Sequence, residues 1–407
     1  MSFQDASRRI EELKDECVRF LVRICSIPAL GPENQGGGEM EKYAVIREVV
    51  RELGPDQEIE VHAPDDRVPD GVRPNLLAIF NGRDTSRTLW LLTHIDVVPP
   101  GEATLWDHDP FKPHVESGYL FGRGVEDNGQ SLAASVLATR AVKETTGFGM
   151  NVGLALVSDE ETGSRYGLEH VLQTRPDLFK PQDLILVPDA GNEDGDHIEI
   201  AEKHLVHVKV KVKGVQAHAS RPDVGRNTLR AAANLIVEMD KALRERFTEV
   251  NSFFSPPTST FEPTRKDANV PNVNTIPGED VFYLDCRVLP EVDLSQVSEE
   301  MRKVAERVGN QFEVTVEVHE HLRLDSPPPT RPDSPVVVAL AQAVQEVYGV
   351  QARPVGIGGQ TVAAFFRRRG LQAAVWEKTL QSCHAPNEKI SLDNLIGNAK
   401  VFAKMML

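Results

Sequence analysis

Short apolar runs that alternate with helical stretches constrain the fold of this chain more than any other feature. In the first half of the chain, a helical stretch at residues 130–143 separates two pairs of apolar runs, at residues 75–80, 88–92, 152–157 and 184–187. Strands that alternate with helices along a sequence favour a layered α/β structure. We therefore predict a central mixed sheet that is flanked by helices.

Further elements are predicted on both sides of these runs. Near the start of the chain, Ile10, Leu13, Cys17, Leu21 and Ile24 recur at the spacing of one face of an amphipathic helix. The other predicted elements are a helix at residues 39–53, a helix at 336–348, a strand at 373–376 and a final helix at 392–406.

The middle of the chain has a different pattern, because residues 206–213 alternate strictly between apolar and polar side chains. This alternation is typical of a strand with one buried and one solvated face. The next predicted elements are a helix at 228–247, strands at 272–276 and 281–288, a helix at 294–308 and a strand at 313–318. The order β-α-β-β-α-β describes a ferredoxin-like unit. We predict an inserted domain at 205–326, which ends at a proline-rich link, within a larger domain formed by 1–204 and 327–407.

Length and charge exclude several classes of protein. A chain of 407 residues is too long for one ordinary core, which favours two domains. Its 61 acidic and 45 basic side chains give a formal charge of −16, so phosphate backbones repel it and no nucleic-acid partner is expected. A charged first segment and the lack of a membrane-length apolar run predict a cytoplasmic protein without membrane partners. The four cysteines form no CxxC pair, which predicts idle thiols rather than a cysteine zinc site.

Histidine and acidic side chains follow the predicted strands, which is where ligands bind in open α/β sheets. His94 and Asp96 come directly after one strand and, being two residues apart, point the same way on an extended segment. A metal-bound histidine commonly donates its other ring N–H to a carboxylate, which Asp96 could supply. Taken alone, the pair also fits a surface histidine beside an aspartate in a loop.

Two further acidic clusters have both a structural and a chemical interpretation. Asp127 follows two glycines at the start of a predicted helix, where aspartate is also favoured as an N-cap. Glu160 and Glu161 follow another strand, and neighbouring carboxylates raise each other's pKa unless a cation separates them. With a cation, one glutamate binds it and the other stays free as a base. Without one, the pair is a solvated acidic turn.

The ends of two more predicted strands carry Asp189 and His384. Each is ordinary alone, but three carboxylates and two imidazoles at the ends of successive strands form a ligand set that suits Zn²⁺, Co²⁺ or Mn²⁺. A carboxylate shared by two ions would bring them about 3.5–4 Å apart, as in two-metal hydrolases. The sequence therefore predicts a site for divalent metal ions.

The order and context of these motifs resemble the co-catalytic zinc metallopeptidase family over nearly the whole chain. This family includes aminoacylase, acetylornithine deacetylase, succinyl-diaminopimelate desuccinylase, glutamate carboxypeptidase and several dipeptidases. The resemblance implies two divalent ions, with zinc expected and cobalt or manganese as alternatives. His94 and Asp189 would bind the first ion. Glu161 and His384 would bind the second, and Asp127 would bridge both.

The inserted domain matches the family as well. The run 214–222 resembles the family's lid motif, in which a histidine reaches the site of a partner subunit. The resemblance therefore implies a catalytic role for His218, a lid and dimerisation role for the inserted domain, and a homodimer. The substrate-binding residues that it implies are Asn274, Arg287, Gly358 and Gly359.

Two positions depart from the family's pattern. The family usually has Asp-x-Lys-Gly from the bridging aspartate onward, whereas Asp127 is followed here by Asn128, Gly129 and Gln130. Asp189 stands where many deacylases and carboxypeptidases of the family have glutamate. Dipeptidases and tripeptidases of the family more often have aspartate there, which favours peptide substrates.

The predicted function is hydrolysis of the amide bond of a small peptide or an N-acyl amino acid. A metal-activated water would attack the carbonyl. The resemblance implies that Glu160 is the general base and that Asp96 is the carboxylate behind His94. An N-succinyl or N-acetyl diamino acid is the alternative substrate. Enzyme-like folds also host proteins without catalysis, so a metal-free binding or regulatory protein is the alternative function.

Overall fold

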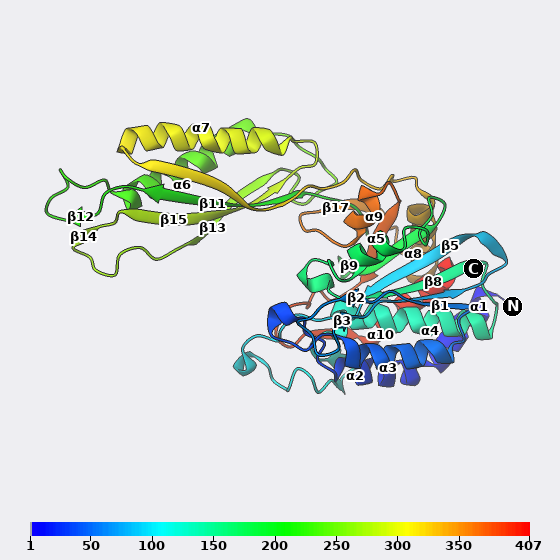
Figure 1. The fold of residues 1–407 in the computed structure, drawn as a ribbon. Coiled ribbons are helices and arrows are strands. Elements are labelled where there is room, and N and C mark those ends of the chain that lie inside the picture. The colour runs from blue at the N-terminus through cyan, green and yellow to red at the C-terminus, as the bar shows by residue number, and fades with distance from the viewer. Residues whose placement is uncertain (1) are drawn as a thin grey trace. The chain divides into compact units, whose positions relative to one another are not determined.

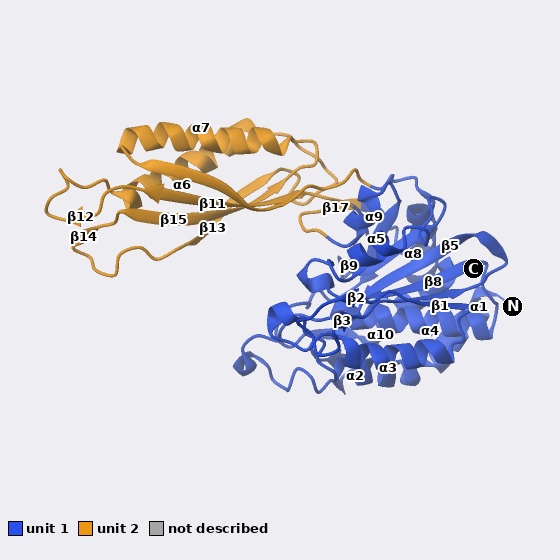
Figure 2. Cartoon of the chain, viewed as in Figure 1, with its two compact units in different colours: residues 1–200, 330–354, 361–407 blue, residues 201–329, 355–360 orange. Residues whose placement is uncertain are grey.

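The computed structural model describes residues 2–407 (Figure 1), which form two compact units (Figure 2). Unit 1 contains the chain up to Ile200 together with Thr330–Pro354 and Thr361–Leu407. Unit 2 contains Ala201–Pro329 and Val355–Gln360. Each unit has its own helices and its own main sheet.

An eight-stranded sheet runs through unit 1 (Figure 1). In sheet order its strands are β1 (Gln57–Glu60), β4 (Leu76–Phe80), β8 (Met150–Val157), β5 (Asp84–His94), β9 (Leu184–Asn192), β18 (Ala373–Lys378), β10 (His197–Glu202) and β17 (Arg353–Ile357). The four strands β8, β5, β9 and β18 are parallel, whereas β1 pairs antiparallel with β4, β4 with β8, and β10 with β18. This mixed sheet with flanking helices confirms the predicted α/β fold.

Helices cover both faces of this sheet, so its middle strands must be apolar at nearly every position. On one face, α5 (Leu168–Thr174) and α9 (Ala363–Arg368) enclose a core in which the ring of Phe179 lies 4.7 Å from that of Trp90 and 4.9 Å from that of Phe366. The helices on the opposite side are α1 (Phe3–Glu12), α2 (Lys14–Cys25), α3 (Met40–Glu52), α4 (Ser131–Glu144), α8 (Pro335–Tyr348) and α10 (Leu392–Met405), of which α4, α8 and α10 touch the sheet.

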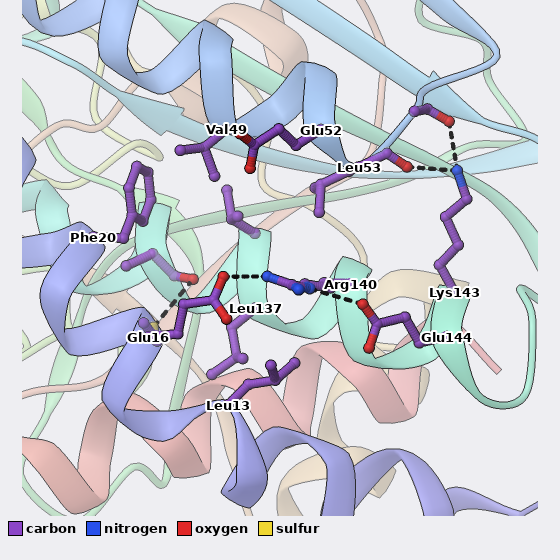
Figure 3. Close-up of a pocket in the computed structure, with 14 residues that line it drawn as sticks. Leu13, Glu16, Phe20, Val49, Glu52, Leu53, Leu137, Arg140, Lys143 and Glu144 are labelled. Carbon is purple, nitrogen blue, oxygen red and sulfur yellow. Dashed lines mark hydrogen bonds and ion pairs between the residues drawn. The ribbon is translucent and has the colours of Figure 1, made fainter.

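A hollow of about 530 Å³ lies between α2, α3 and α4 (Figure 3). Apolar side chains such as Phe20 and Leu137 line it, and Arg140 forms ion pairs with Glu16 and Glu144 beside them. None of the residues that line this hollow belongs to the predicted metal site. The hollow is therefore a feature of the helical layer alone.

Unit 2 has a four-stranded antiparallel sheet, covered on one face by α6 (Thr228–Arg246) and α7 (Leu294–Phe312). In sheet order its strands are β13 (Thr260–Lys266), β15 (Glu279–Val288), β11 (His204–Lys213) and β16 (Thr315–Leu324). The alternation along β11 places its valines in the core and its lysines outside. Along the chain the elements follow the β-α-β-β-α-β order that the sequence predicts.

The second strand of this sheet lies elsewhere than predicted. The prediction places it at residues 272–276, but only β14 (Thr275–Ile276) forms there, and it pairs with β12 (Ala217–His218) outside the main sheet. Val273 is fully exposed, so the apolar pattern that suggested a strand is not buried. The strand that forms instead is β13, in which Pro263 interrupts the residue pattern of a strand. A proline is tolerated there because β13 lies at the sheet edge.

The single amphipathic helix predicted at the start is two helices, because the chain breaks at Leu13 between α1 and α2. A break of one residue leaves the apolar spacing nearly in phase, so periodicity alone does not reveal it. Arg9 in the last turn of α1, with Asp15 and Glu16 in the first turn of α2, suits the dipoles of two separate helices. Among residues 2–407, no helix combines the length and the apolar character needed to cross a bilayer.

Candidate metal centre

The carboxyl ends of four neighbouring strands meet at one edge of the sheet in unit 1. Because β8, β5, β9 and β18 are adjacent and parallel, the segments that follow them emerge side by side. His94 is the last residue of β5 and pairs with Val157, the last residue of β8. The predicted metal ligands that reach this edge are His94, Asp127, Glu161, Asp189 and His384.

The buried imidazole of His94 lies between carboxylates. Its Nε2 is 2.8 Å from Oδ1 of Asp127 and 3.3 Å from Oδ1 of Asp189. Its Nδ1 lies 3.1 Å from the backbone oxygen of Asp96 and 3.5 Å from the Oδ1 of that residue. The contact at Nδ1 fixes the ring, which leaves Nε2 available to bind an ion together with the two carboxylates.

A second group forms around His384, on the other side of Asp127. The Nε2 atom of His384 is 3.0 Å from Oδ2 of Asp127 and 3.1 Å from Oε2 of Glu161. The side chain of His384 is 54% exposed, compared with 2% for His94, so this half of the cluster is open to solvent. The two oxygens of Asp127 thus face different imidazoles, which is the arrangement of a carboxylate placed between two cation sites.

The composition of the cluster favours bound cations. Five carboxylates, from Asp96, Asp127, Glu160, Glu161 and Asp189, surround only two imidazoles, and their negative charges repel one another unless cations lie between them. Within the described residues, the buried Oε1 of Glu161 has no hydrogen-bond partner, which is costly for a carboxylate oxygen unless it binds an ion. Imidazole nitrogens with carboxylate oxygens suit Zn²⁺, Co²⁺ or Mn²⁺, so these residues fit a pair of divalent ions.

The pKa values of the cluster reflect the same excess of negative charge. Burial, followed by the negative charge of Asp189, raises the pKa of the Glu160 carboxyl well above its ordinary value. Hydrogen bonds to Asp127 and Glu161 raise the pKa of the His384 imidazole to about 10. The raised pKa means that each of these two groups holds a proton, which offsets the negative charge of the cluster. Divalent cations would neutralise the same charge when bound.

Asp96 connects the end of β5 to the turn that carries the two glutamates. Its Oδ1 accepts a hydrogen bond from the backbone N–H of Glu160, and its Oδ2 accepts one from that of Glu161, both at 3.1 Å. Asp159 begins this turn with a left-handed φ of 63° and accepts a hydrogen bond from the backbone N–H of Tyr166. The carboxylate of Asp96 therefore positions the glutamate turn as well as facing the imidazole of β5.

Glu388 lies at the centre of a hydrogen-bond network for which the sequence analysis names no role. Its buried carboxylate accepts four hydrogen bonds of 2.6–3.1 Å, from the backbone N–H groups of Gly124, Glu126 and Asp127 and from Nη1 of Arg123. One carboxylate thus fixes the loop that presents Asp127. Its position four residues after His384 was the only signal that the sequence offered.

Glu126 provides a second buried link that the sequence analysis missed. Its carboxylate accepts hydrogen bonds from the backbone N–H of Leu380, at 2.6 Å, and from the N–H and hydroxyl of Ser382. These acceptors hold the segment between β18 and His384 against the loop of Asp127. The link joins parts of the chain more than 250 residues apart, so no local motif could have revealed it.

Asn128, the residue directly after Asp127, contacts a predicted ligand directly. Its side-chain N–H₂ donates to Oδ1 of Asp189 at 2.8 Å and to the backbone oxygen of Pro188 at 2.7 Å. The residue after Asp127 therefore orients the carboxylate of Asp189.

The other predicted site residues lie in unit 2 and form two local groups. In the first, His218 pairs with Thr275 between β12 and β14, and the neighbouring Ala219 N–H donates to the backbone oxygen of Asn274 at 2.9 Å. The His218 ring is exposed, and its Nδ1 lies 2.8 Å from the hydroxyl of Ser220. The hairpin therefore brings His218 and Asn274 close together.

The second group in unit 2 is built around Arg287. Its guanidinium binds the two carboxylate oxygens of Asp285 through Nε at 2.6 Å and Nη2 at 3.0 Å. Its Nη1 donates to the backbone oxygen of Gly358 at 2.9 Å, next to Gly359. Arg287 and the glycine pair are therefore neighbours, and Asp285 holds the guanidinium in a fixed orientation.

Comparison with known proteins identifies the family. The sequence pattern of peptidase family M20/M25/M40 matches residues 90–407. An uncharacterized metallohydrolase of Methanocaldococcus jannaschii is 35% identical over 411 residues, which cover 97% of this chain and 100% of the relative. The succinyl-diaminopimelate desuccinylase of Sulfurovum sp. is 28% identical and covers 76% of this chain and 80% of its own length.

A solved structure agrees with this family at the level of the fold. Human carnosine dipeptidase 1 superimposes with a TM-score of 0.77 over 100% of this chain and 98% of the human chain, at 19% identity. The family pattern covers well over half of the chain, and the geometry at the strand ends is that of a site for divalent metal ions. The chain therefore belongs to peptidase family M20/M25/M40 and is a metal-dependent amidohydrolase.

Proposed function

We propose that the two groups around Asp127 hold two divalent metal ions and that the physiological metal is zinc. His94 and Asp189 bind the first ion, and Glu161 and His384 bind the second. The observation that carries this proposal is the position of Asp127, whose Oδ1 lies 2.8 Å from one imidazole and whose Oδ2 lies 3.0 Å from the other. Each ion then has a histidine nitrogen and carboxylate oxygens, which are common ligands of zinc.

The proposed reaction is hydrolysis of an amide bond. When bound, two divalent ions lower the pKa of a water and polarise the substrate carbonyl. Glu160 accepts the proton that the attacking water loses and then donates it to the leaving amine nitrogen. Donor atoms of Glu160, His94 and Asp189 lie within 4.8 Å of one another, so the base is within reach of a water beside the first ion. Asp96 keeps Glu160 in place through its backbone N–H.

The proposed substrate is a dipeptide or another small peptide. Asp189, where many deacylases of the family have glutamate, supports this choice. A second candidate is an N-succinyl or N-acetyl diamino acid, because a desuccinylase is among the relatives that cover most of this chain. A metal-free binding protein on the same scaffold is disfavoured, because the donors for both ions and the carboxylate of Glu160 occur together.

Unit 2 supplies the proposed substrate contacts. A guanidinium that is already oriented by Asp285 suits a substrate carboxylate, so Arg287 is assigned to that group, with Gly358 and Gly359 beside it. His218, with Asn274 next to it, is assigned to the transition state of a partner subunit in a homodimer. The unpaired thiols, three of which are buried, support a reducing compartment such as the cytoplasm.

A hydrolysis screen tests the proposed function directly. Purified protein, loaded in separate samples with Zn²⁺, Co²⁺ or Mn²⁺, is incubated with dipeptides, N-acetyl amino acids and N-succinyl diamino acids, and the released amine is quantified by mass spectrometry. We expect dipeptides to be cleaved fastest and zinc to support turnover. Fastest cleavage of the succinylated compounds would select the second candidate, and a protein that binds no metal ions and shows no turnover would select the metal-free alternative.

Replacement of Glu388 by glutamine tests how the loop of Asp127 is held. Glutamine has one acceptor oxygen instead of two, and its N–H₂ would face backbone N–H groups and Arg123. Partners that orient metal ligands typically contribute about 10–100-fold in metal affinity, so we expect a loss in this range, measured by competition with a chromogenic chelator. Glu346→Gln, at an exposed ion pair with Lys404, is the matched control and should bind metal as the native chain does. Equal affinities in the two variants would contradict the role of Glu388.

A further inference from the structure

We propose a third metal site in unit 1, formed by His108, His114 and Glu116. One ligand atom from each of these side chains lies within 4.8 Å of the other two. They come from the loop and hairpin that precede Gly122, and none of them belongs to the binuclear cluster around Asp127. The ligand that this set favours is a single Zn²⁺ ion or another borderline divalent cation. The proposal does not depend on the reaction that the enzyme catalyses.

Two of the ligands are brought together by a strand. His114 and Glu116 are the ends of β6 (His114–Glu116), and residues two apart on a strand point to the same face. β6 pairs antiparallel with β7 (Tyr119–Phe121), with His114 opposite Phe121. The two rings are stacked, with centroids 5.2 Å apart and planes 11° apart, so the plane of the His114 imidazole is fixed by packing.

The third ligand, His108, comes from the loop before this hairpin. Its ring lies edge-on to that of His114, with centroids 4.2 Å apart. The loop is held in place on both sides of His108: the backbone N–H of Asp107 donates to Oδ1 of Asn387 at 2.9 Å, and Oδ1 of Asp109 accepts from the backbone N–H of Phe111 at 3.0 Å. The approach of the two imidazoles is therefore built into the fold of this segment.

The chemistry of the site points to a cation. Within the described part of the chain, the Nε2 atom of His114 is buried and has no hydrogen-bond partner, although an imidazole nitrogen in that position normally has one. His114 lines a small hollow of about 160 Å³ together with His108 and Glu116. Two imidazoles and one carboxylate are a ligand set that zinc uses when a fourth position is left to water. Asp107 and Asp109 line the same hollow and add negative charge that favours a cation.

An ion here would fasten the segment that leads into the binuclear cluster. β7 pairs with β19 (Lys389–Ser391), and the backbone N–H of Gly122 donates to the backbone oxygen of Glu388 at 2.9 Å. A metal ion that joins the His108 loop to β6 would therefore stabilise the segment before Asp127 and its contacts with the segment after His384. We infer a structural role for this ion, separate from the ions that take part in hydrolysis.

Metal counting on the full-length protein tests the third site. The native chain, equilibrated with buffered micromolar Zn²⁺ and measured by inductively coupled plasma mass spectrometry, should hold three ions per chain. The His108→Ala/His114→Ala variant should hold two. His319→Ala, which removes an exposed histidine near Glu317 in unit 2, is the matched control and should hold three. Equal metal content in the native chain and the double variant would overturn the proposal.

Two further variants separate this site from the binuclear cluster and from a loss of folding. Glu116→Gln changes one exposed ligand and should weaken zinc binding at this site by about tenfold or more, because an amide is a poorer ligand than a carboxylate. Asp127→Asn should lose ions from the binuclear cluster yet keep the third, visible with Cu²⁺ as an electron paramagnetic resonance signal with coupling to two imidazole nitrogens. Loss of that signal when His108→Ala/His114→Ala is added to Asp127→Asn supports the site, whereas persistence of the coupling to two imidazole nitrogens contradicts it.

Discussion

The Glu160→Gln variant is expected to keep two metal ions in the binuclear cluster and to lose about 10²–10⁴-fold in kcat, the usual contribution of a general base. Glutamine preserves the size of the side chain but cannot accept a proton at neutral pH. The turn should persist, because its hydrogen bonds to Asp96 come from the backbone N–H groups of residues 160 and 161 and not from their side chains. Initial rates on the best substrate of the screen, together with the metal content of the same sample, measure both effects.

The metal content decides between two roles for this carboxylate. Glu160 lies close enough to His94 and Asp189 to be a third protein ligand of the first ion instead of a base. If Glu160→Gln lost one ion along with its activity, Glu160 would be a ligand. If turnover stayed within a few fold of the native rate, Glu160 would be neither a ligand nor the general base. Glu169→Gln, in a half-buried position on α5, controls for the general effect of removing an acidic side chain.

The parts of the fold that were predictable are those in which burial dictates the sequence. The middle strands of the unit 1 sheet lie between two layers of helices, so they must be apolar at nearly every position, as β8 is from Val152 onward. In β11 only one face is buried, and its alternating valines and lysines record this directly. Long helices such as α6 and α7 also carry clear periodicity, because one face packs on the sheet beneath them.

The parts that were missed are those whose pairing depends on distant segments. β1 and β13 lie at sheet edges, where few side chains are buried and Pro263 is tolerated. β10 reads as a short polar and apolar mixture, HIEIAE, yet almost all of it is buried, because it lies between β18 and β17 in the folded sheet. Such positions become strands through tertiary contacts, which local patterns do not record.

In the candidate site, too, some residues have a local sequence signal and others depend on distant contacts. Each predicted metal ligand stands in a short motif, beside a strand end or, for Asp127, at the start of a helix, so a sequence motif can point to it. The residues that hold those ligands are different: Glu388 acts on backbone N–H groups more than 260 positions away, and Glu126 acts on the segment before His384. A buried glutamate that caps a distant loop has no local signature, because its partners are the N–H groups that any residue carries.

Replacement of Asp127 by asparagine is expected to have the largest effect on metal binding, because its two carboxylate oxygens are paired with two different imidazoles. Its Oδ1 lies beside Nε2 of His94 and its Oδ2 beside Nε2 of His384. Asparagine keeps one oxygen, which can serve one ion only, and it removes the charge that draws the two ions together. We expect fewer than two ions to remain in the cluster. Catalysis by two metal ions lowers the activation free energy by about several kcal/mol, so its loss should lower kcat/KM by about 10³-fold or more.

Comparison with single-site variants makes this prediction specific. Asp189 forms an ion pair with His94 and Glu161 forms one with His384, so Asp189→Asn and Glu161→Gln should each weaken one ion and leave the other bound. Asp66→Asn, at an exposed position, should bind metal as the native chain does and controls for the loss of one negative charge. Isothermal titration calorimetry of each metal-free variant with Zn²⁺ gives the number of bound ions and their affinities. If Asp127→Asn lost no more than Asp189→Asn does, Asp127 would serve a single ion, and the paired site would have to be abandoned.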